Sequence, residues 1–273
     1  MSLINRAKSH CFILLLIVMA SSCEEEGTEN KSTPLPLEPA IELDTFPDSS
    51  DTEIEFIQPE FPKLDSTNAV DFLTNYFQEN KERKIQLSTR VGTLKVRLFD
   101  DTPLHTANFL MMTKREYYNG TEFIRVVPNF VVQGGNNESE TEEIKRLLIG
   151  TYKIPAEFKD HHIHKKGVLA MARSYENNPK KKSSAYYFYF VQGQKFNEPQ
   201  LLALERDHEM QIPEWKRKVY KEIGGAPHLD GQHTVFGEIY EGLEILDKMA
   251  AVPTDKGDWP LEALEMKVEV INE

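Results

Sequence analysis

The sequence predicts an all-β barrel with capping α-helices, extended by a helical insertion and a disordered N-terminal tether. From about residue 81 onward, apolar and polar residues alternate over short runs, which is typical of half-buried β-strands. Only two core helices are expected among these runs, and many short strands with few helices favour a barrel. Before residue 81, acidic residues and prolines are frequent, and such a composition buries too little apolar surface to fold alone.

Residues 1–22 predict a signal peptide. Arg6 and Lys8 precede an apolar run over residues 11–20, which is too short for a membrane-spanning helix of about 20 residues. The following Ala20-Ser21-Ser22-Cys23 resembles the lipobox of bacterial lipoproteins. This resemblance implies a lipid anchor at Cys23 in the bacterial cell envelope, at the outer membrane on its periplasmic face or at the cell surface. An ordinary signal peptide followed by a free Cys23 is the alternative.

Residues 23–80 predict an acidic tether. The first 80 residues hold 4 Lys/Arg against 15 Asp/Glu, whereas the remaining 193 hold 28 against 29. Such a segment repels itself and extends, and the chain has no clustered basic face for nucleic acid. Glu24-Glu25-Glu26 resembles acidic export signals of some Bacteroidetes lipoproteins, although these acids also simply solvate a tether. Residues 67–80 have apolar residues at helical spacing and predict a short helix packed on the domain.

The folded domain is predicted over residues 81–273. Residues 85–91 and 94–98 alternate around Gly92 and predict a hairpin. Thr102 and Pro103 suit the N-cap and first position of a helix that Asn119-Gly120 ends. The further predicted elements are a hairpin at 123–135, strands at 167–173 and 186–193, a mainly helical insertion at 198–222, a strand at 233–240, a helix at 242–250 and a strand at 264–271.

Several common catalytic and cofactor motifs are absent from the sequence. It has no Gly-rich phosphate loop, HExxH, GxSxG or CxxC. His161, His162 and His164 lie close together, and a metal site there is conceivable. Because HHIH stands between Asp160 and Lys165-Lys166, however, the segment resembles a solvated turn, and we expect neither metal nor cofactor.

One charged side chain, Arg125, lies within the apolar run FIRVVPNFVVQGG at residues 123–135. A buried guanidinium is costly without acceptors, and Gln133 on the returning strand can offer its amide oxygen. Two interpretations follow. Arg125 and Gln133 form a structural pair, or Arg125 lines an apolar pocket with free N–H groups directed at a polar ligand.

Five segments resemble, in the same order, sequence blocks of the cyclophilin family of peptidyl-prolyl isomerases. FIRVVPNFVVQGG looks like the family signature F-H-R-x-I-P-x-F-x-x-Q-G-G, and HLDGQHTVFGEI looks like [WFY]-L-D-G-x-H-x-V-F-G-x-V. The other segments are RLFDDTPLHTANF, GVLAMAR and SSAYYFYFVQG. Together they cover roughly residues 84–272. The resemblance implies a cyclophilin-like barrel that isomerises X–Pro bonds in polypeptides without a cofactor.

The resemblance also implies roles for individual residues. Arg125 matches the catalytic arginine, and Gln133 matches the glutamine that orients the arginine and the substrate. Phe130, a pocket wall, and His233, at the groove's edge, complete the catalytic set. The substrate-binding positions are Val131, Ala172, Arg173, Tyr187, Tyr189, His228 and Leu229.

Two positions depart from the family pattern. Tyr187 stands where the family usually has Gln, so an amide that contacts substrate backbone is lost. His228 stands where the family has Trp, Phe or Tyr, so an aromatic lid that also favours cyclosporin is lost. These departures leave a non-catalytic binding module for Pro-containing peptides as the alternative to an isomerase. A purely structural surface lipoprotein is a third interpretation, but it does not explain Arg125 opposite Gln133.

Overall fold

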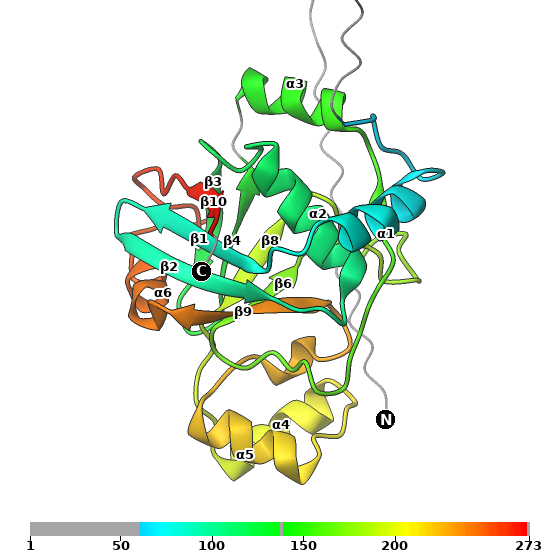
Figure 1. The fold of residues 1–273 in the computed structure, drawn as a ribbon. Coiled ribbons are helices and arrows are strands. Elements are labelled where there is room, and N and C mark those ends of the chain that lie inside the picture. The colour runs from blue at the N-terminus through cyan, green and yellow to red at the C-terminus, as the bar shows by residue number, and fades with distance from the viewer. Residues whose placement is uncertain (1–60, 137–138, 272–273) are drawn as a thin grey trace, which may run out of the picture. The chain divides into compact units, whose positions relative to one another are not determined.

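The structure is a computed structural model that describes residues 61–136 and 139–271 (Figure 1). The predicted signal peptide, Cys23 and the tether up to residue 60 lie outside the described residues. Helix α1 (Ala69–Glu79) occupies the range where a short helix was predicted, and it buries Leu73 and Tyr76 in the domain core. Of the helices within the described ranges, none has both the length and the apolar character needed to cross a bilayer.

Eight antiparallel strands form one curled sheet in the order β10-β1-β2-β9-β6-β8-β4-β3. Its two edges meet just before β10, where Glu122 of β3 bridges Glu265 and the amide of Phe123 donates to the carbonyl of Leu264 at 3.0 Å. The sheet therefore has the barrel form that the alternation predicts. The strands are β1 (Lys84–Thr89), β2 (Gly92–Leu98), β3 (Glu122–Val127), β4 (Val131–Asn136), β6 (Val168–Met171), β8 (Phe188–Val191), β9 (Val235–Glu241) and β10 (Lys267–Val270), and a separate pair is formed by β5 (Lys153–Ile154) and β7 (Ser183–Ser184).

Helix α2 (Pro103–Lys114) is packed against the barrel core and buries Phe109, Leu110 and most of its other side chains. The helix begins as predicted, with Thr102 at the N-cap and Pro103 as its first residue, but it ends at Lys114 and not at Asn119-Gly120. The Thr102 hydroxyl is buried without a partner and forms no capping hydrogen bond. The carboxylate of Glu157 accepts instead from the backbone N–H groups of Leu104 and His105, at 3.1 and 3.0 Å. A carboxylate at a helix N-terminus also complements the helix dipole.

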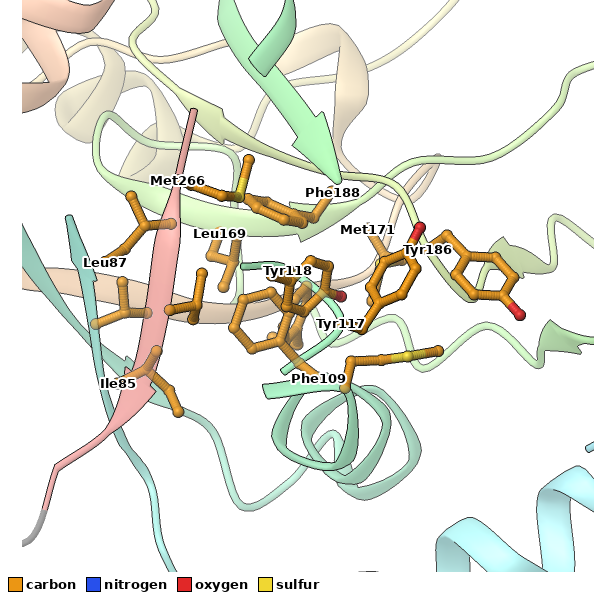
Figure 2. Packing of buried hydrophobic residues seen from close by; sticks show 14 of the residues in the cluster. Ile85, Leu87, Phe109, Tyr117, Tyr118, Leu169, Met171, Tyr186, Phe188 and Met266 are labelled. Atoms are coloured by element: carbon orange, nitrogen blue, oxygen red, sulfur yellow. The ribbon is translucent and has the colours of Figure 1, made fainter. Parts of the chain in front are cut away.

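The barrel interior is filled by large aromatic side chains (Figure 2). Phe109 of α2 meets Phe188 of β8 edge to face, with ring centroids 5.2 Å apart and planes at 85°. Tyr118 packs on both rings, at 4.9 and 5.2 Å. Edge-to-face contacts of this kind stabilise beyond the burial of apolar area alone. The core thus holds α2 at a fixed position across the sheet.

Strand β8 is buried on both faces. One face is turned to the barrel interior, and the other is turned to the outside of the barrel, where the candidate site lies. Phe188 and Phe190 point into the interior cluster, whereas Tyr189 and Val191 belong to a second apolar cluster. This division follows from the period of two along a strand. The second cluster contains Val131, Val168, Ala170, Ala172, Tyr189, Val191, Ala226, Leu229 and Val235.

The predicted insertion forms two helices, α4 (Glu198–Asp207) and α5 (Glu214–Glu222), which lie beside each other (Figure 1). Asn197 and Gln200 form a capping box at the start of α4. The two helices share a small core of Leu201, Ile212 and Tyr220 with Ile163. The remaining helices are α6 (Leu243–Ala250), as predicted, and α3 (Glu140–Ile149) and the 3₁₀ turn η1 (Pro227–Leu229), which the sequence did not predict.

Candidate active site

The β3–β4 hairpin carries the first part of the site. Asn129 adopts the left-handed conformation, with φ of 62°, which asparagine tolerates better than most residues. Its backbone N–H donates to the side-chain oxygen of Gln192 at 2.6 Å, so the turn is tied to the end of β8. The register places Arg125 opposite Gln133 on the neighbouring strand. A tight, anchored turn therefore sets the positions of both side chains.

A cavity of about 160 Å³ lies against this hairpin. Its walls include every residue predicted for the site except Tyr187 and His228, together with Tyr175, which was not predicted. The lining residues are Arg125, Phe130, Val131, Gln133, Ala172, Arg173, Tyr175, Tyr189, Leu229 and His233. The structure thus brings together residues from β3, β4, β8, the segment after β6 and the segment before β9.

Arg125 differs from the sequence-based expectation in its exposure and its partner. Its side chain is 43 % exposed, not buried, because it lies on the outer face of the barrel beside an open cavity. Its ion-pair partner is Asp258, with 3.5 Å between Nε and Oδ2, instead of the predicted Gln133. Asp258 is held in place by its backbone carbonyl, which accepts from the N–H of Val126 at 2.8 Å. The guanidinium lies 5.9 Å from the ring centroid of Phe130.

His233 is neutral, and its contacts define the tautomer. Burial lowers the pKa of His233 to about 4. Its Nδ1 lies 3.2 Å from the carbonyl of Met171, so Nδ1 carries the proton and donates it there. Nε2 is then the acceptor for the Tyr175 hydroxyl at 2.8 Å. Because the guanidinium of Arg173 stacks 4.2 Å above the ring of Tyr175, these three side chains form one edge of the cavity.

A buried polar network supports the cavity wall from below. The Tyr189 hydroxyl lies 3.1 Å from Nε2 of His164, a fully buried side chain whose pKa is lowered by burial. Nδ1 of His164 lies 3.1 Å from the Asp230 carboxylate, which also accepts from Lys216 and Tyr220 of the insertion at 2.9 and 2.8 Å. The insertion is therefore connected by hydrogen bonds to the wall of the site.

The two departures from the family pattern lie beside the cavity and do not line it. His228 stacks on Phe130 at 5.3 Å, and His208 at the end of α4 stacks on the other side at 5.0 Å. Burial lowers the pKa of His228 to about 4, so a neutral imidazole lies in this stack. Tyr187 lines a neighbouring cavity of about 400 Å³, and its hydroxyl accepts from Arg146 of α3 at 3.2 Å.

Comparison with known proteins identifies the family. Residues 84–270 match the family model described as cyclophilin type peptidyl-prolyl cis-trans isomerase/CLD. The chain belongs to the cyclophilin family. It is a peptidyl-prolyl cis-trans isomerase, as the sequence blocks predict.

Individual relatives of this cyclophilin agree with the assignment. A putative peptidyl-prolyl cis-trans isomerase of Staphylococcus saprophyticus is 32% identical over 206 residues, which cover 73% of this chain and 100% of the relative. A putative bifunctional phosphatase/peptidyl-prolyl cis-trans isomerase of Streptococcus pyogenes is 31% identical over 209 residues, but only 39% of its length is covered. In fold, the chain is similar to a crystal structure of a cyclophilin type isomerase of Cryptosporidium parvum, with a TM-score of 0.51 and 20% identity over 71% of this chain and 99% of that chain.

Two residues of this cyclophilin's site escaped the sequence interpretation. Tyr175 comes two positions after Arg173, which was predicted to lie beside the groove, and this spacing could have indicated that Tyr175 lines the cavity as well. Asp258 lies far along the chain from Arg125, in a loop without periodicity, and no sequence pattern connects the two.

Proposed function

We propose that Arg125 is the catalytic residue of this isomerase. The observation that carries the proposal is the location of a guanidinium in the wall of a small cavity lined with Phe130, Val131 and Leu229. Such a cavity suits a pyrrolidine ring, because its apolar side chains exclude water from the ring while the guanidinium of Arg125 faces the ring nitrogen. Substrates in this proposal are proline-containing segments of polypeptides.

The proposed mechanism is electrostatic. An X–Pro amide rotates slowly because the nitrogen lone pair is conjugated with the carbonyl, and the barrier is ~18–20 kcal/mol. When the bond twists, the nitrogen becomes pyramidal and basic. An N–H of Arg125 directed at this nitrogen then bonds more strongly in the twisted state than in the planar state, and only such differential binding accelerates the reaction.

The other lining residues have binding and positioning roles in this proposal. Phe130, Val131, Tyr189 and Leu229 hold the proline ring while the rest of the amide rotates. Gln133, opposite Arg125 in the register, offers an amide to the substrate backbone. Asp258 orients the guanidinium, and its distance of 3.5 Å from Nε leaves the other guanidinium nitrogens for the substrate.

The test is the isomerisation of a short X–Pro peptide by the full chain and by Arg125→Ala. Loss of one preorganised donor costs about 10²–10³ in rate in other enzymes, and the partial exposure of Arg125 favours about 10²-fold here. Arg97→Ala is the matched control, because Arg97 is a 57 % exposed arginine in an ion pair with Glu238 and does not line the cavity. Peptide binding without acceleration by the unmutated chain, or an Arg125→Ala variant as active as Arg97→Ala, would contradict the proposal.

We further propose that the isomerase acts outside the cytoplasm, attached to a membrane through lipid at Cys23. The support is the sequence of residues 1–23, with a basic start, a short apolar run and the Ala20–Cys23 segment. In a bacterial host fed labelled palmitate, the chain should take up label and sediment with membranes, whereas Cys23→Ser should do neither. Equal labelling of the two proteins would refute the anchor without affecting the proposal for Arg125.

A further inference from the structure

Two histidines of the HHIH segment meet an aspartate that lies 60 residues earlier in the chain. Nε2 of His161 is 2.9 Å from one carboxylate oxygen of Asp101, and Nε2 of His162 is 2.7 Å from the other. The three potential ligand atoms all lie within 4.8 Å of one another. His164 is not part of this group, since its fully buried ring bonds to Asp230 and Tyr189. The HHIH segment therefore divides into a pair of histidines that contact Asp101 and a third histidine that contacts Asp230 and Tyr189.

His162 and Asp101 are held in place by separate parts of the fold. His162 stacks on Phe99, with ring centroids 4.1 Å apart and planes at 14°, and only 14 % of its side chain is exposed. Phe99 is fixed in turn, because its backbone N–H donates to Phe236 at 2.8 Å and its carbonyl accepts from the hydroxyl of Thr106 at 2.6 Å. Asp101 lies just before α2. The geometry of the pair His162–Asp101 is thus set by the barrel and not by the loop alone.

From this arrangement we propose that Asp101, His161 and His162 bind a divalent transition-metal ion, with zinc as the ion that the ligand set suits. Two imidazoles and one carboxylate are ligands that Zn²⁺ accepts, at 2.0–2.2 Å each. Tetrahedral coordination at those distances separates the ligand atoms by roughly 3.3 Å. The three ligand atoms lie within 4.8 Å of one another, so their separations need to change by no more than about 1.5 Å, which the exposed side chains of His161 and Asp101 allow.

The local charges also favour a cation. Asp101 is 41 % exposed, and its carboxylate supplies the negative charge of the ligand set, to which the two histidines would each add one ring nitrogen. The preceding residue, Asp100, is already paired with Arg83 at 2.7 Å, so Asp101 is the carboxylate of the cluster. Three protein ligands leave at least one coordination position open to water, so the site is not of the closed, purely structural type.

A bound ion would tie two functional parts of the molecule together. The loop that carries His161 and His162 also contributes Glu157, which caps α2, and His164, which supports Tyr189 under the active-site cavity. An ion bridging this loop to Asp101 would restrict its motion in the folded state only. Because a ligand that binds only the folded state stabilises it, the melting temperature should rise with the zinc concentration.

Zinc binding to the metal-free full chain tests the proposal, with a chromophoric chelator as competitor and Co²⁺ as a spectroscopic probe. We expect one zinc ion per chain at this site. His162→Phe keeps the stacking on Phe99 but removes the ligand nitrogen, and Asp101→Asn keeps the size of the side chain but removes its charge. Each variant should weaken zinc affinity at least about tenfold, since the loss of even an outer partner of a metal ligand lowers metal affinity by about 10–100-fold. His208→Ala removes an exposed histidine outside the cluster and should change the affinity less than about twofold.

The expected Co²⁺ spectrum has visible absorption bands typical of imidazole coordination, and these bands should be lost in His162→Phe. The melting temperature of the unmutated chain should rise with zinc, and that of His162→Phe should rise much less. Zinc affinity that is equal in the unmutated chain, His162→Phe and Asp101→Asn would overturn the proposal, and so would a chain that binds no zinc. Neither outcome depends on isomerase activity, so the test is separate from that of Arg125.

Discussion

Replacing Asp230 with alanine should strongly destabilise the protein. The carboxylate is only 9 % exposed, and it accepts from Tyr220, Lys216 and both the backbone and the ring of His164, at 2.8 to 3.1 Å. Burial alone would raise the pKa of Asp230, but these donors lower it, so the carboxylate is ionised in the folded state. Removing it leaves the ammonium of Lys216 without its counter-charge in a largely buried location.

The expected loss follows from this burial. Breaking a buried charge pair by removing one partner costs about 3–5 kcal/mol, which corresponds to a fall in melting temperature of roughly 6–20 °C for a domain of this size. Urea unfolding followed by circular dichroism measures the loss in free energy. Asp247→Ala is the matched control, because Asp247 also binds a lysine, Lys166, at 2.6 Å, but is 47 % exposed. The control should lose less than about 1 kcal/mol.

Equal losses in Asp230→Ala and Asp247→Ala would refute the reasoning, because burial is the feature that distinguishes the two aspartates. A loss of less than about 1 kcal/mol in Asp230→Ala would refute it as well, since the network would then contribute no more than a surface pair.

Three further results are expected. The pKa values of about 4 for His228 and His233 lie below the ~6.5 of an unfolded histidine, so the unfolded chain binds more protons between these two pH values. The free energy of unfolding should therefore fall as the pH is lowered from about 6.5 to 4, and His233→Gln should reduce this fall. A pH dependence of the unfolding free energy, measured by urea titration, that is the same in His233→Gln and the unmutated chain would argue against this explanation. His208→Ala removes one ring from the stack on His228 and should raise KM about threefold for an X–Pro peptide with kcat nearly unchanged, whereas an unaltered KM would show that the stack does not shape the site. Tyr175→Phe removes the hydroxyl that bonds to Nε2 of His233 and should lower kcat/KM about threefold to tenfold. The melting temperature should stay within about 2 °C, because the side chain of Tyr175 is largely exposed. A large loss of stability with full activity would show that Tyr175 has a structural role and not a role in the site.

The strands could be predicted because a strand has a simple period, and most of the site residues could be predicted because their segments resemble sequence blocks of the family. The resemblance placed Tyr189 among the substrate-binding residues, and in the structure Tyr189 lies on the cavity side of β8 whereas Phe188 lies in the core, as the period of two along a strand requires. The hairpin register likewise placed Arg125 opposite Gln133. In each case the relevant neighbours lie on adjacent strands whose pairing the sequence pattern already indicates.

What the sequence did not predict are the contacts that loop residues make with distant parts of the chain. Glu157 caps α2 across about 50 residues, Asp258 pairs with Arg125 across more than 130, and Asp101 reaches His161 across 60. Loop residues have no periodic pattern, so nothing in the sequence indicates which loops meet. Helix α3 was missed for a different reason, because its sequence holds a usable helical signal, with Ile144, Leu147 and Leu148 at helical spacing, although these side chains are largely exposed.

The junction of the sheet edges determines when the domain can be completed during synthesis. β10 pairs with β1, near the other end of the folded domain, and the residues just before β10 bridge to β3. A chain still emerging from the ribosome therefore exposes two open strand edges, those of β1 and β3, until residues 264–270 have emerged. Such edges can pair with other chains, and distant pairings of this kind form slowly. Translation that stops before residue 264 should consequently yield an aggregating product and not a smaller isomerase.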